Sequence, residues 1–181
     1  MTAEETYIEL SRHVKPPEKA SSAPWTNTIY VFDLDGTLRD DSHRYDYVAD
    51  DHIKNYDRYN ALGVLDKKLD VPCRFYEHFH EHAFFAIVTA SPRKREGLVH
   101  MWREAAGLSK PLFYLARPEG CELSSPEFKR QALRAITVSG WKVELAFDDR
   151  RDVIGMYREE GIPAVLVTTD NATGQATLGV S

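Results

Sequence analysis

Residues 32–38 read Phe-Asp-Leu-Asp-Gly-Thr-Leu and directly follow the apolar run Thr28-Ile-Tyr-Val-Phe32. Two carboxylates placed two residues apart after a buried strand are costly, because each loses its water and repels the other unless a cation or a substrate compensates. Gly36 allows the chain to turn sharply there, and Thr37 adds a hydroxyl and a further backbone N–H. The stretch therefore predicts a buried strand that ends in a functional acidic loop.

Four more apolar runs along the chain have the length of buried strands. They are residues 83–88, 112–115, 143–147 and 164–167. Their nearly continuous apolar character is typical of strands covered on both faces, as in a parallel sheet. Helical patterns separate them, one after Ser91 and others starting near Pro126 and Asp149. This alternation predicts an α/β fold with a five-stranded parallel sheet and helices on both faces.

The sequence divides into an arm, a main domain and a tail. Residues 1–27 combine a short helical pattern with a linker rich in Pro, Ser and Ala, and we expect a loosely attached arm. Residues 28–168 hold the predicted domain, and residues 169–181 show no periodicity and predict a flexible tail. Within the domain, residues 39–72 contain no convincing strand but a helix-like run over 51–62. An insertion after the first strand lies at the ligand-binding edge of the sheet, so this segment predicts a small, mainly helical cap.

The composition is that of an ordinary globular protein. Of 181 residues, 43% are hydrophobic, and 23 Lys and Arg against 28 Asp and Glu give a net charge of −5. These values exclude wholesale disorder and argue against a general nucleic-acid coat, although a local basic patch could still steer a phosphate. No run reaches the roughly 18 apolar residues of a membrane-spanning helix, so no membrane partner is expected. The chain starts without a secretory pattern, and Cys73 and Cys121 cannot form a disulfide framework, which favours a cytoplasmic location.

Chemically active side chains follow the other predicted strands as well. Asp148 and Asp149 come directly after residues 143–147, Thr89 follows the second run, and Lys129 lies at the start of a predicted helix. The carboxyl ends of parallel strands meet at one edge of a sheet, so we expect these groups to converge on the acidic loop. Carboxylates from two strand ends, with room left for water, are ligands that Mg²⁺ prefers when it also holds a phosphate. A single acidic pair is often only a solvated loop end, but four matching junctions indicate a functional site.

In this order the motifs resemble those of the haloacid-dehalogenase-like (HAD) phosphohydrolases. The signature Asp-x-Asp-Gly-Thr-[Leu/Val] matches residues 33–38, and the second motif matches Ile87-Val-Thr89. Lys129 matches the third motif, and Asp148-Asp149 with Asp152 matches the fourth. The resemblance covers nearly all of the predicted domain. It implies a HAD-like Rossmannoid fold, an Mg²⁺ cofactor and phosphatase activity.

The resemblance also implies roles for the acidic residues. Asp33 would attack phosphorus and form an aspartyl-phosphate. Asp35 would protonate the leaving oxygen and then activate the hydrolytic water. Mg²⁺ would be held by Asp33, the Asp35 backbone carbonyl and Asp149, with Asp148 or Asp152 behind them.

Further residues are expected to hold the substrate. By the same resemblance, Thr89 and Lys129 would bind the transferring phosphoryl group, and Lys129 would stabilise the intermediate. The other residues expected to touch the substrate are Gly36, Thr37, Ala90, His43, Arg44, Arg93 and Arg117.

Four longer stretches carry a finer resemblance. They are Asp40-Asp-Ser-His43-Arg44, Met101-Trp102-Arg103, Arg117-Pro118-x-Gly120 and Phe147-Asp-Asp-Arg150. Together they resemble the phosphatase half of phage polynucleotide kinase-phosphatase, a family that removes 3′-phosphates from nucleic-acid ends and nucleotides. The phosphate-binding loop of the kinase half does not occur in the sequence, so a stand-alone phosphatase is expected. Where that family has Ser-Gly-Arg, this chain has Thr89-Ala-Ser91, and Arg93 follows two residues later as the expected substitute.

Three functions stay open at the level of sequence. The first is an Mg²⁺-dependent phosphatase whose substrate is a nucleotide or a nucleic-acid 3′ end. The second is a 5′-nucleotidase or small-metabolite phosphatase with the same core. The third, a non-catalytic binding domain, is disfavoured because all the costly charged motif residues are kept. The sequence does not decide the oligomeric state.

Overall fold

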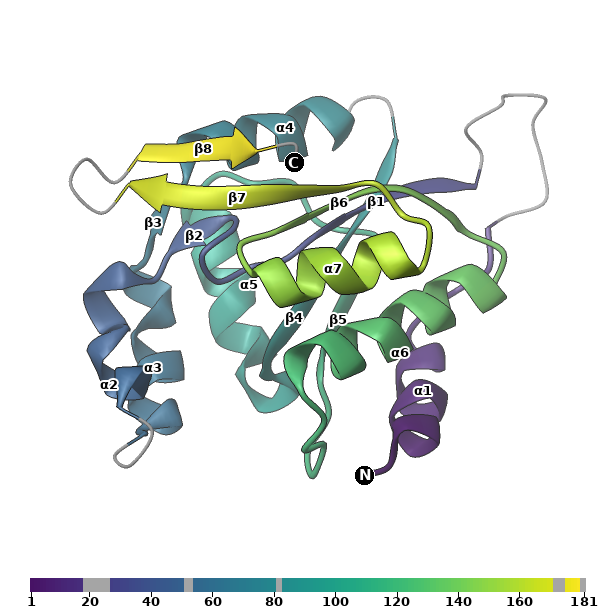
Figure 1. The fold of residues 1–181 in the computed structure, drawn as a ribbon. Helices are drawn as coiled ribbons and strands as arrows, with labels where there is room; N and C mark the ends of the chain where they lie inside the picture. The colour runs from purple at the N-terminus through teal and green to yellow at the C-terminus, as the bar shows by residue number, and fades with distance from the viewer. Residues whose placement is uncertain (18–26, 51–53, 81–82, 171–174, 180–181) are drawn as a thin grey trace.

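A six-stranded sheet forms the centre of the molecule in the computed structural model, which describes residues 1–17, 27–50, 54–80, 83–170 and 175–179 (Figure 1). The strands are β1 (Thr28–Phe32), β4 (Phe84–Pro92), β5 (Phe113–Arg117), β6 (Lys142–Asp148), β7 (Ala164–Asp170) and β8 (Gln175–Gly179). Their order is β5-β4-β1-β6-β7-β8, and the first five are mutually parallel as predicted. The predicted strand number is wrong, because β8 pairs antiparallel with β7 at the edge.

The strand β8 corrects the expectation of a flexible tail for residues 175–179. Its sequence alternates, so Ala176 is buried and Leu178 packs on the core while their neighbours face outward. An antiparallel edge strand needs only this alternation, whereas the prediction of strands rested on the continuous apolar runs of strands buried on both faces. The last residues of the tail and the turn before β8 lie outside the described residues.

Helices cover both faces of the sheet, as the sequence predicts. One face carries α1 (Ala3–Ser11), α6 (Ser125–Val138) and α7 (Arg151–Glu159), and the other carries α4 (Asp70–His80) and α5 (Glu96–Ala105) (Figure 1). Successive side chains of β1 point to opposite faces of the sheet and contribute to both hydrophobic cores: Ile29 and Val31 pack toward α6, and Phe32 packs toward α4. No helix in the described part of the chain combines the length and apolar composition needed to cross a membrane.

The N-terminal arm is attached more firmly than the sequence suggests. Helix α1 starts with the capping box of Thr2 and Glu5 and buries Leu10 in the core that α6 shares. The Trp141 indole N–H donates to the Lys15 carbonyl, which fixes the chain beyond the helix. Loose attachment is therefore wrong for residues 1–17, and the linker at 18–26 lies outside the described residues.

The insertion between β1 and α4 is mainly helical, as predicted. It contains β2 (Arg39–Asp40), η1 (Ser42–Arg44), α2 (Asp46–Ala49), α3 (Tyr56–Leu62), η2 (Gly63–Leu65) and β3 (Lys67–Lys68). The helix-like run over 51–62 becomes α3 from Tyr56 onward, and 51–53 lie outside the described residues. Strands β2 and β3 pair antiparallel at the base of the insertion and were too short to show a sequence pattern. Figure 1 shows the insertion beyond the carboxyl end of β1.

Candidate active site

The side chain of Asp33 lies where β1 and β6 end side by side. The Asp33 backbone N–H donates to the Phe147 carbonyl at 2.9 Å, which brings Asp33 next to Asp148. From the start of α6, the Lys129 ammonium donates to Asp33 Oδ1 at 2.6 Å and to Asp148 Oδ2 at 2.5 Å. All three side chains are buried. Three of the four predicted junctions therefore converge here through direct hydrogen bonds.

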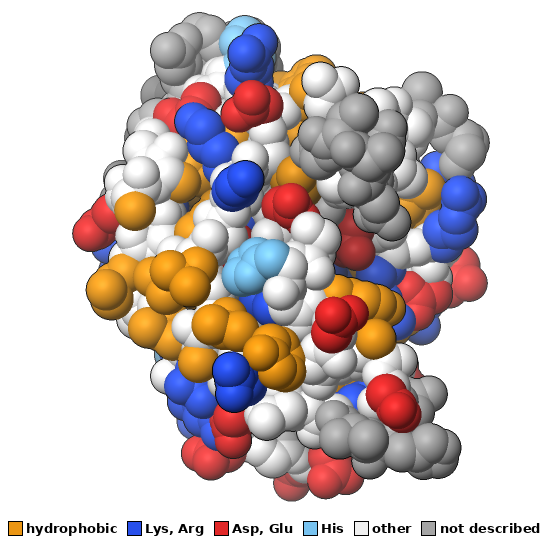
Figure 2. Space-filling model, turned by 90° about the vertical axis from the view of Figure 1, so that its left-hand side faces the viewer, with side chains coloured by type: hydrophobic (Ala, Val, Ile, Leu, Met, Phe, Trp, Pro, Cys, Tyr) orange, Lys and Arg blue, Asp and Glu red, His pale blue; other side chains and the backbone are white. Residues whose placement is uncertain are grey.

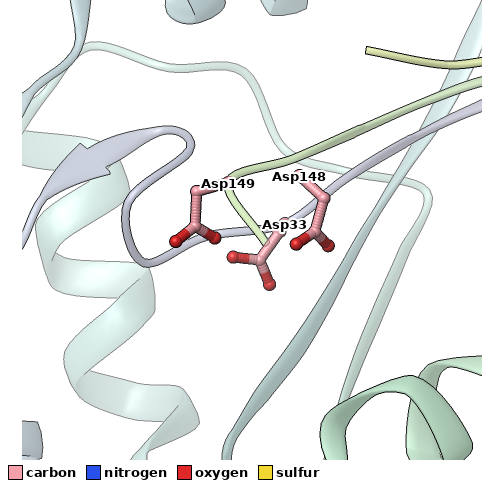
Figure 3. A group of neighbouring side chains, drawn as sticks. All are labelled: Asp33, Asp148 and Asp149. Atoms are coloured by element: carbon pink, nitrogen blue, oxygen red, sulfur yellow. The ribbon is translucent and has the colours of Figure 1, made fainter. Parts of the chain in front are cut away.

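A third carboxylate completes this acidic cluster (Figure 3). Asp33, Asp148 and Asp149 each offer an oxygen, and these atoms lie within 4.8 Å of one another. Gly36 has φ of 76°, and a Cβ there would lie 2.7 Å from Asp149 Oδ2. Only glycine therefore allows the acidic loop to turn against Asp149. We call Asp33, Asp148, Asp149 and Lys129 the metal-site cluster.

The metal-site cluster carries more negative than positive charge. Burial raises the pKa of Asp33 well above its usual value, the Asp148 and Asp149 charges add to the rise, and Lys129 only partly opposes it. Desolvation and the Asp148 charge raise the pKa of Asp149 to about 7. Burial disfavours the Lys129 ammonium, but Asp148 and Asp33 outweigh it and raise the pKa of Lys129. Three carboxylates facing one ammonium make a site that favours binding of a further cation.

The donor set fits a divalent cation such as Mg²⁺, because all its ligand atoms are hard oxygens. Asp148 is already engaged by Lys129 and by the Arg150 backbone N–H at 3.1 Å. Asp152 pairs with the Arg150 guanidinium at 2.6 Å. Within the described part of the chain, no ion pair and no hydrogen bond from another residue engages the Asp149 carboxylate. This arrangement favours Asp149 over Asp148 and Asp152 as a direct ligand.

Asp35 lies in a different environment two residues further along the loop. Arg39 Nε and Arg44 Nη2 donate to Asp35 Oδ1 at 2.7 and 2.5 Å, and Ser91 Oγ donates to Asp35 Oδ2 at 2.6 Å. Burial would raise the pKa of Asp35, but the two guanidinium groups outweigh it and lower the pKa well below the usual range. Arg44 is fully buried, so it reaches Asp35 rather than solvent.

The small hydroxyl residues predicted to bind a phosphoryl group are buried beside these carboxylates. Thr89 is 1% exposed, and its Oγ1 accepts the Ser91 backbone N–H at 3.1 Å. Thr37 is fully buried, and its Oγ1 has no partner among the described residues. Buried hydroxyls are normally satisfied, so an unpartnered one within the acidic loop is consistent with a missing ligand.

Protein groups engage the two arginines expected to grip the substrate. Both terminal nitrogens of Arg93 contact the His13 ring, with Nη2 to Nδ1 at 2.9 Å. Arg117 donates to the Ala90 carbonyl at 3.0 Å and to the Leu123 carbonyl at 2.5 Å. Arg93 therefore connects the segment just after β4 to the turn after α1. Arg117 connects β4 to the loop before α6. Their contact with substrate stays a prediction.

Sequence reasoning did not identify four residues around Asp35. They are Arg39, Asn60, Asp66 and the hydroxyl of Ser91 as a partner of Asp35. Arg39 directly follows the acidic motif, and that proximity could have indicated it. Asp66 is a single acidic residue in a polar segment, and no spacing distinguishes it from its neighbours.

Comparison with known proteins agrees with this geometry. The family model described as the polynucleotide kinase PNKP phosphatase domain matches residues 27–171. Similar solved structures include a chain of a Pnkp1/Rnl/Hen1 complex, with 17% identity and a TM-score of 0.67, covering 86% of this chain and 50% of that one. A chain of the Pnkp1/Rnl/Hen1 RNA repair complex has 17% identity and a TM-score of 0.65, covering 87% and 46%.

A third structure extends the comparison beyond repair complexes. A haloacid dehalogenase-like hydrolase from Streptococcus pneumoniae has 16% identity and a TM-score of 0.53, covering 76% of this chain and 82% of that one. The present chain spans about half the length of the first two chains. No curated protein matches the sequence at a significant level. Because the family model covers most of the chain and the fold is shared, the chain belongs to the family of polynucleotide kinase phosphatase domains, within the HAD-like phosphatases.

Proposed function

We propose that this protein is an Mg²⁺-dependent phosphomonoesterase that acts through an aspartyl-phosphate, and that its substrate is a polynucleotide or nucleotide 3′-phosphate. The metal-site cluster carries the proposal, because three carboxylates lie around one ammonium, and a fourth carboxylate, Asp35, is held separately beside them. Residues 28–168 would form the catalytic unit and residues 39–72 its cap.

The first step transfers the phosphoryl group to Asp33. Lys129 holds Asp33 Oδ1, so Oδ2 attacks phosphorus while the bond from phosphorus to the leaving oxygen breaks. Asp35 gives a proton to that oxygen. Because Arg39 and Arg44 lower the pKa of Asp35 in the free site, the negative charge of the bound phosphate must first raise this pKa so that Asp35 takes up the proton. Thr89, Lys129 and backbone groups of the acidic loop hold the phosphoryl oxygens.

The second step hydrolyses the aspartyl-phosphate. Asp35, now ionised, takes a proton from water, whose oxygen attacks phosphorus as the bond to Asp33 breaks. Phosphate leaves, Asp33 is again a carboxylate, and Asp35 is again protonated for the next cycle. Mg²⁺, held by Asp33, Asp149 and the Asp35 carbonyl with Asp148 behind, would supply positive charge to the phosphoryl oxygens.

A pocket beside Asp35 supports a nucleotide as the leaving group. It has a volume of about 510 Å³ and lies between α3 and the end of β4, with Lys54, Tyr56, Asn60 and Lys94 in its wall. Ser91 Oγ donates to Asp35 Oδ2 and lies 3.4 Å from Asn60 Oδ1, so the side chains of Ser91 and Asn60 connect the pocket to the proposed acid. Asp57 also lines the pocket, 3.6 Å from Lys94 Nζ, so two ammonium groups face one carboxylate there; this positive excess suits a phosphodiester, and the exposed Tyr56 ring offers a stacking surface for a base.

The surface around the insertion is not broadly basic. Figure 2 looks at this side of the molecule and shows Lys and Arg side chains interspersed with Asp and Glu. Together with the net charge of −5, this mixture favours attraction confined to the pocket over general nucleic-acid binding. The family model and the RNA repair complex that contains a similar chain also favour a nucleic-acid end as substrate.

A substrate panel tests the proposal. With Mg²⁺ we expect hydrolysis of an aryl phosphate, better hydrolysis of a 3′-nucleoside monophosphate, and the best kcat/KM for a 3′-phosphorylated oligonucleotide. Higher salt should reduce the advantage of the oligonucleotide, because its phosphate contacts release counterions. A preference for 5′-nucleotides without salt dependence would favour the nucleotidase alternative. Absence of Mg²⁺-dependent hydrolysis in every assay would contradict the whole proposal.

A further inference from the structure

Four charged side chains form a buried cluster between the acidic loop and the insertion. They are Asp35, Arg39, Arg44 and Asp66, which we call the acid-holding cluster. The side chains of Arg44 and Asp66 are fully buried, and those of Arg39 and Asp35 are 3% and 15% exposed. Two carboxylates therefore balance two guanidinium groups inside the protein.

Asp66 holds both arginines of this cluster. Its carboxylate accepts Arg44 Nε at 2.8 Å and Arg44 Nη2 at 2.5 Å, and it lies 3.1 Å from Arg39 Nε. The same nitrogens, Arg44 Nη2 and Arg39 Nε, also donate to Asp35 Oδ1. Each guanidinium therefore bridges Asp66 and Asp35, and the place of Asp66 determines where both arginines present their donors.

The backbone around Asp66 is anchored to the core. The Trp102 indole N–H, from α5, donates to the Asp66 carbonyl at 2.8 Å. The carbonyl of Gly63 accepts both the Asp66 backbone N–H and Arg39 Nη1, at 3.3 and 3.0 Å. Asp66 thus connects a fixed part of the sheet domain to the two donors that hold Asp35.

A planar guanidinium held on two sides has little freedom to turn. If Asp66 lost its charge, Asp35 would be the one carboxylate of the cluster left to both guanidinium groups, and they would shift toward their other acceptors, the Gly63 and Tyr59 carbonyls. The orientation of the Asp35 carboxylate would change with them. Proton transfer to a leaving group depends steeply on that orientation, because donor and acceptor must come within hydrogen-bond reach.

We propose that Asp66 is a positioning residue: through Arg39 and Arg44 it fixes the carboxylate of Asp35 for proton transfer to the leaving group. The inference rests on the proposed function, since it concerns the same Asp35. It assigns to the insertion a part in building the active site, in addition to covering it.

Leaving-group dependence tests this role. For Asp66→Asn we expect the ratio of kcat/KM for a 3′-nucleoside monophosphate to that for 4-nitrophenyl phosphate to fall by about 10-fold or more. The nucleoside is a poor leaving group that needs a proton, whereas 4-nitrophenolate leaves without one. Both values scale with the amount of folded enzyme, so partial unfolding does not change the ratio. Glu77→Gln is the matched control, because Glu77 accepts the Ser109 N–H and hydroxyl before the amino end of β5, whereas Asp35 follows the carboxyl end of the parallel strand β1; we expect its ratio to equal that of the wild type.

A second variant perturbs the cluster without removing a charge. A Cβ at Gly63 would lie 2.9 Å from Arg39 Nη1, and Gly63 has an ordinary helical φ of −59°. Gly63→Ala should therefore fold, displace the Arg39 guanidinium and lower the same ratio by a smaller factor. A wild-type ratio in Gly63→Ala together with a wild-type ratio in folded Asp66→Asn would overturn the inference.

The controls separate this inference from the proposed function. If the wild-type protein hydrolyses both esters with Mg²⁺ and Asp33→Asn hydrolyses neither, the proposed function holds whatever the ratio does. An equal loss of both activities in Asp66→Asn would show that Asp66 is only structural. Absence of wild-type hydrolysis would contradict the proposed function first.

Discussion

The two ends of one short loop contrast in their electrostatics. Asp33 belongs to the metal-site cluster, where Lys129 pairs with Asp33 and Asp148 but not with the third carboxylate, Asp149. Asp35 belongs to the acid-holding cluster, where two carboxylates share two guanidinium groups. The pKa of Asp33 is accordingly raised and that of Asp35 lowered, although burial acts in the same direction on both.

The difference separates a region that needs a ligand from one that is complete in itself. The metal-site cluster has fewer positive than negative groups, so the stability of the folded protein should depend on a bound cation there. The acid-holding cluster is already neutral as a whole and takes its partners from the insertion. One loop can thus present a nucleophile beside a cation site and a rigidly held acid, because different elements supply the compensating charges.

The largest expected effect is the loss of activity in Asp33→Asn. Removing the nucleophile should lower kcat by at least about 10³-fold, because no other carboxylate holds the same place. The neutral amide also removes a repulsive charge, so the melting temperature in metal-free buffer should stay equal or rise. Activity assays and thermal scans on protein verified by mass spectrometry to be free of deamidation check both. Near-wild-type turnover would remove Asp33 from the mechanism.

Removal of one cation from each cluster should cost stability in both. Lys129→Met leaves Asp33 and Asp148 buried without a cation, and Arg44→Met leaves two carboxylates with Arg39 alone. Breaking such a buried pair typically costs about 3–5 kcal/mol, which urea unfolding at pH 8 can measure. We expect Mg²⁺ to stabilise Arg44→Met only as much as it stabilises the wild type, and to stabilise Lys129→Met by more, because only there does the cation replace the lost charge. Equal rescue of both would abolish the contrast between the clusters.

Mg²⁺ should stabilise the wild-type protein through Asp149. At a concentration about 100 times its dissociation constant, a ligand of the folded state contributes about 2.7 kcal/mol, which raises the melting temperature. Asp149→Ala should shift the Mg²⁺ titration to much higher concentration, whereas Asp152→Ala should shift it little, because Arg150 already pairs with Asp152. Identical titration curves for the two variants would show that Asp149 is not the direct ligand.

The smallest expected effect is a pH dependence of the metal-free protein, because Asp149 is exposed and solvent weakens its electrostatic interactions. The pKa of Asp149 is raised in the folded state to about 7 from 3.8, so the folded chain binds more protons between these values. This group therefore makes stability fall as pH rises from about 4 to 7. Asp35, with its lowered pKa, contributes stability that is lost only as pH falls below about 4, the range where it is protonated in the unfolded chain.

Unfolding in EDTA at pH 5 and pH 7.5 separates the two groups. Asp149→Asn should reduce the decrease between these pH values, the rest coming from Asp33, whose pKa is also raised, and Mg²⁺ should reduce it in the wild-type protein. A decrease that is unchanged in Asp149→Asn would assign it to another group.

Much of the candidate site could be predicted because its chemically active residues lie at or near strand ends. Each of them follows or flanks a buried element, as for Asp33, Thr89, Lys129 and Asp148. Parallel pairing of the strands brings such positions to one edge of the sheet. The five parallel strands could also be predicted, because burial on both faces gives continuous apolar runs. Strand β8 was not predicted, because an edge strand buries only alternate residues.

The sequence alone determined the features that depend on residues close together in the chain. These are the acidic loop, its glycine turn and the strands that carry the motifs. The partners of Asp35 depended on the tertiary structure. Asp66 lies 31 residues after Asp35 and reaches it only because the insertion folds back, anchored to Trp102 of α5. Likewise, Arg93 contacts His13, just after α1. The sequence does not show which partner a charged side chain has. Only the packing of the folded chain decides which opposite charge it pairs with where water is excluded.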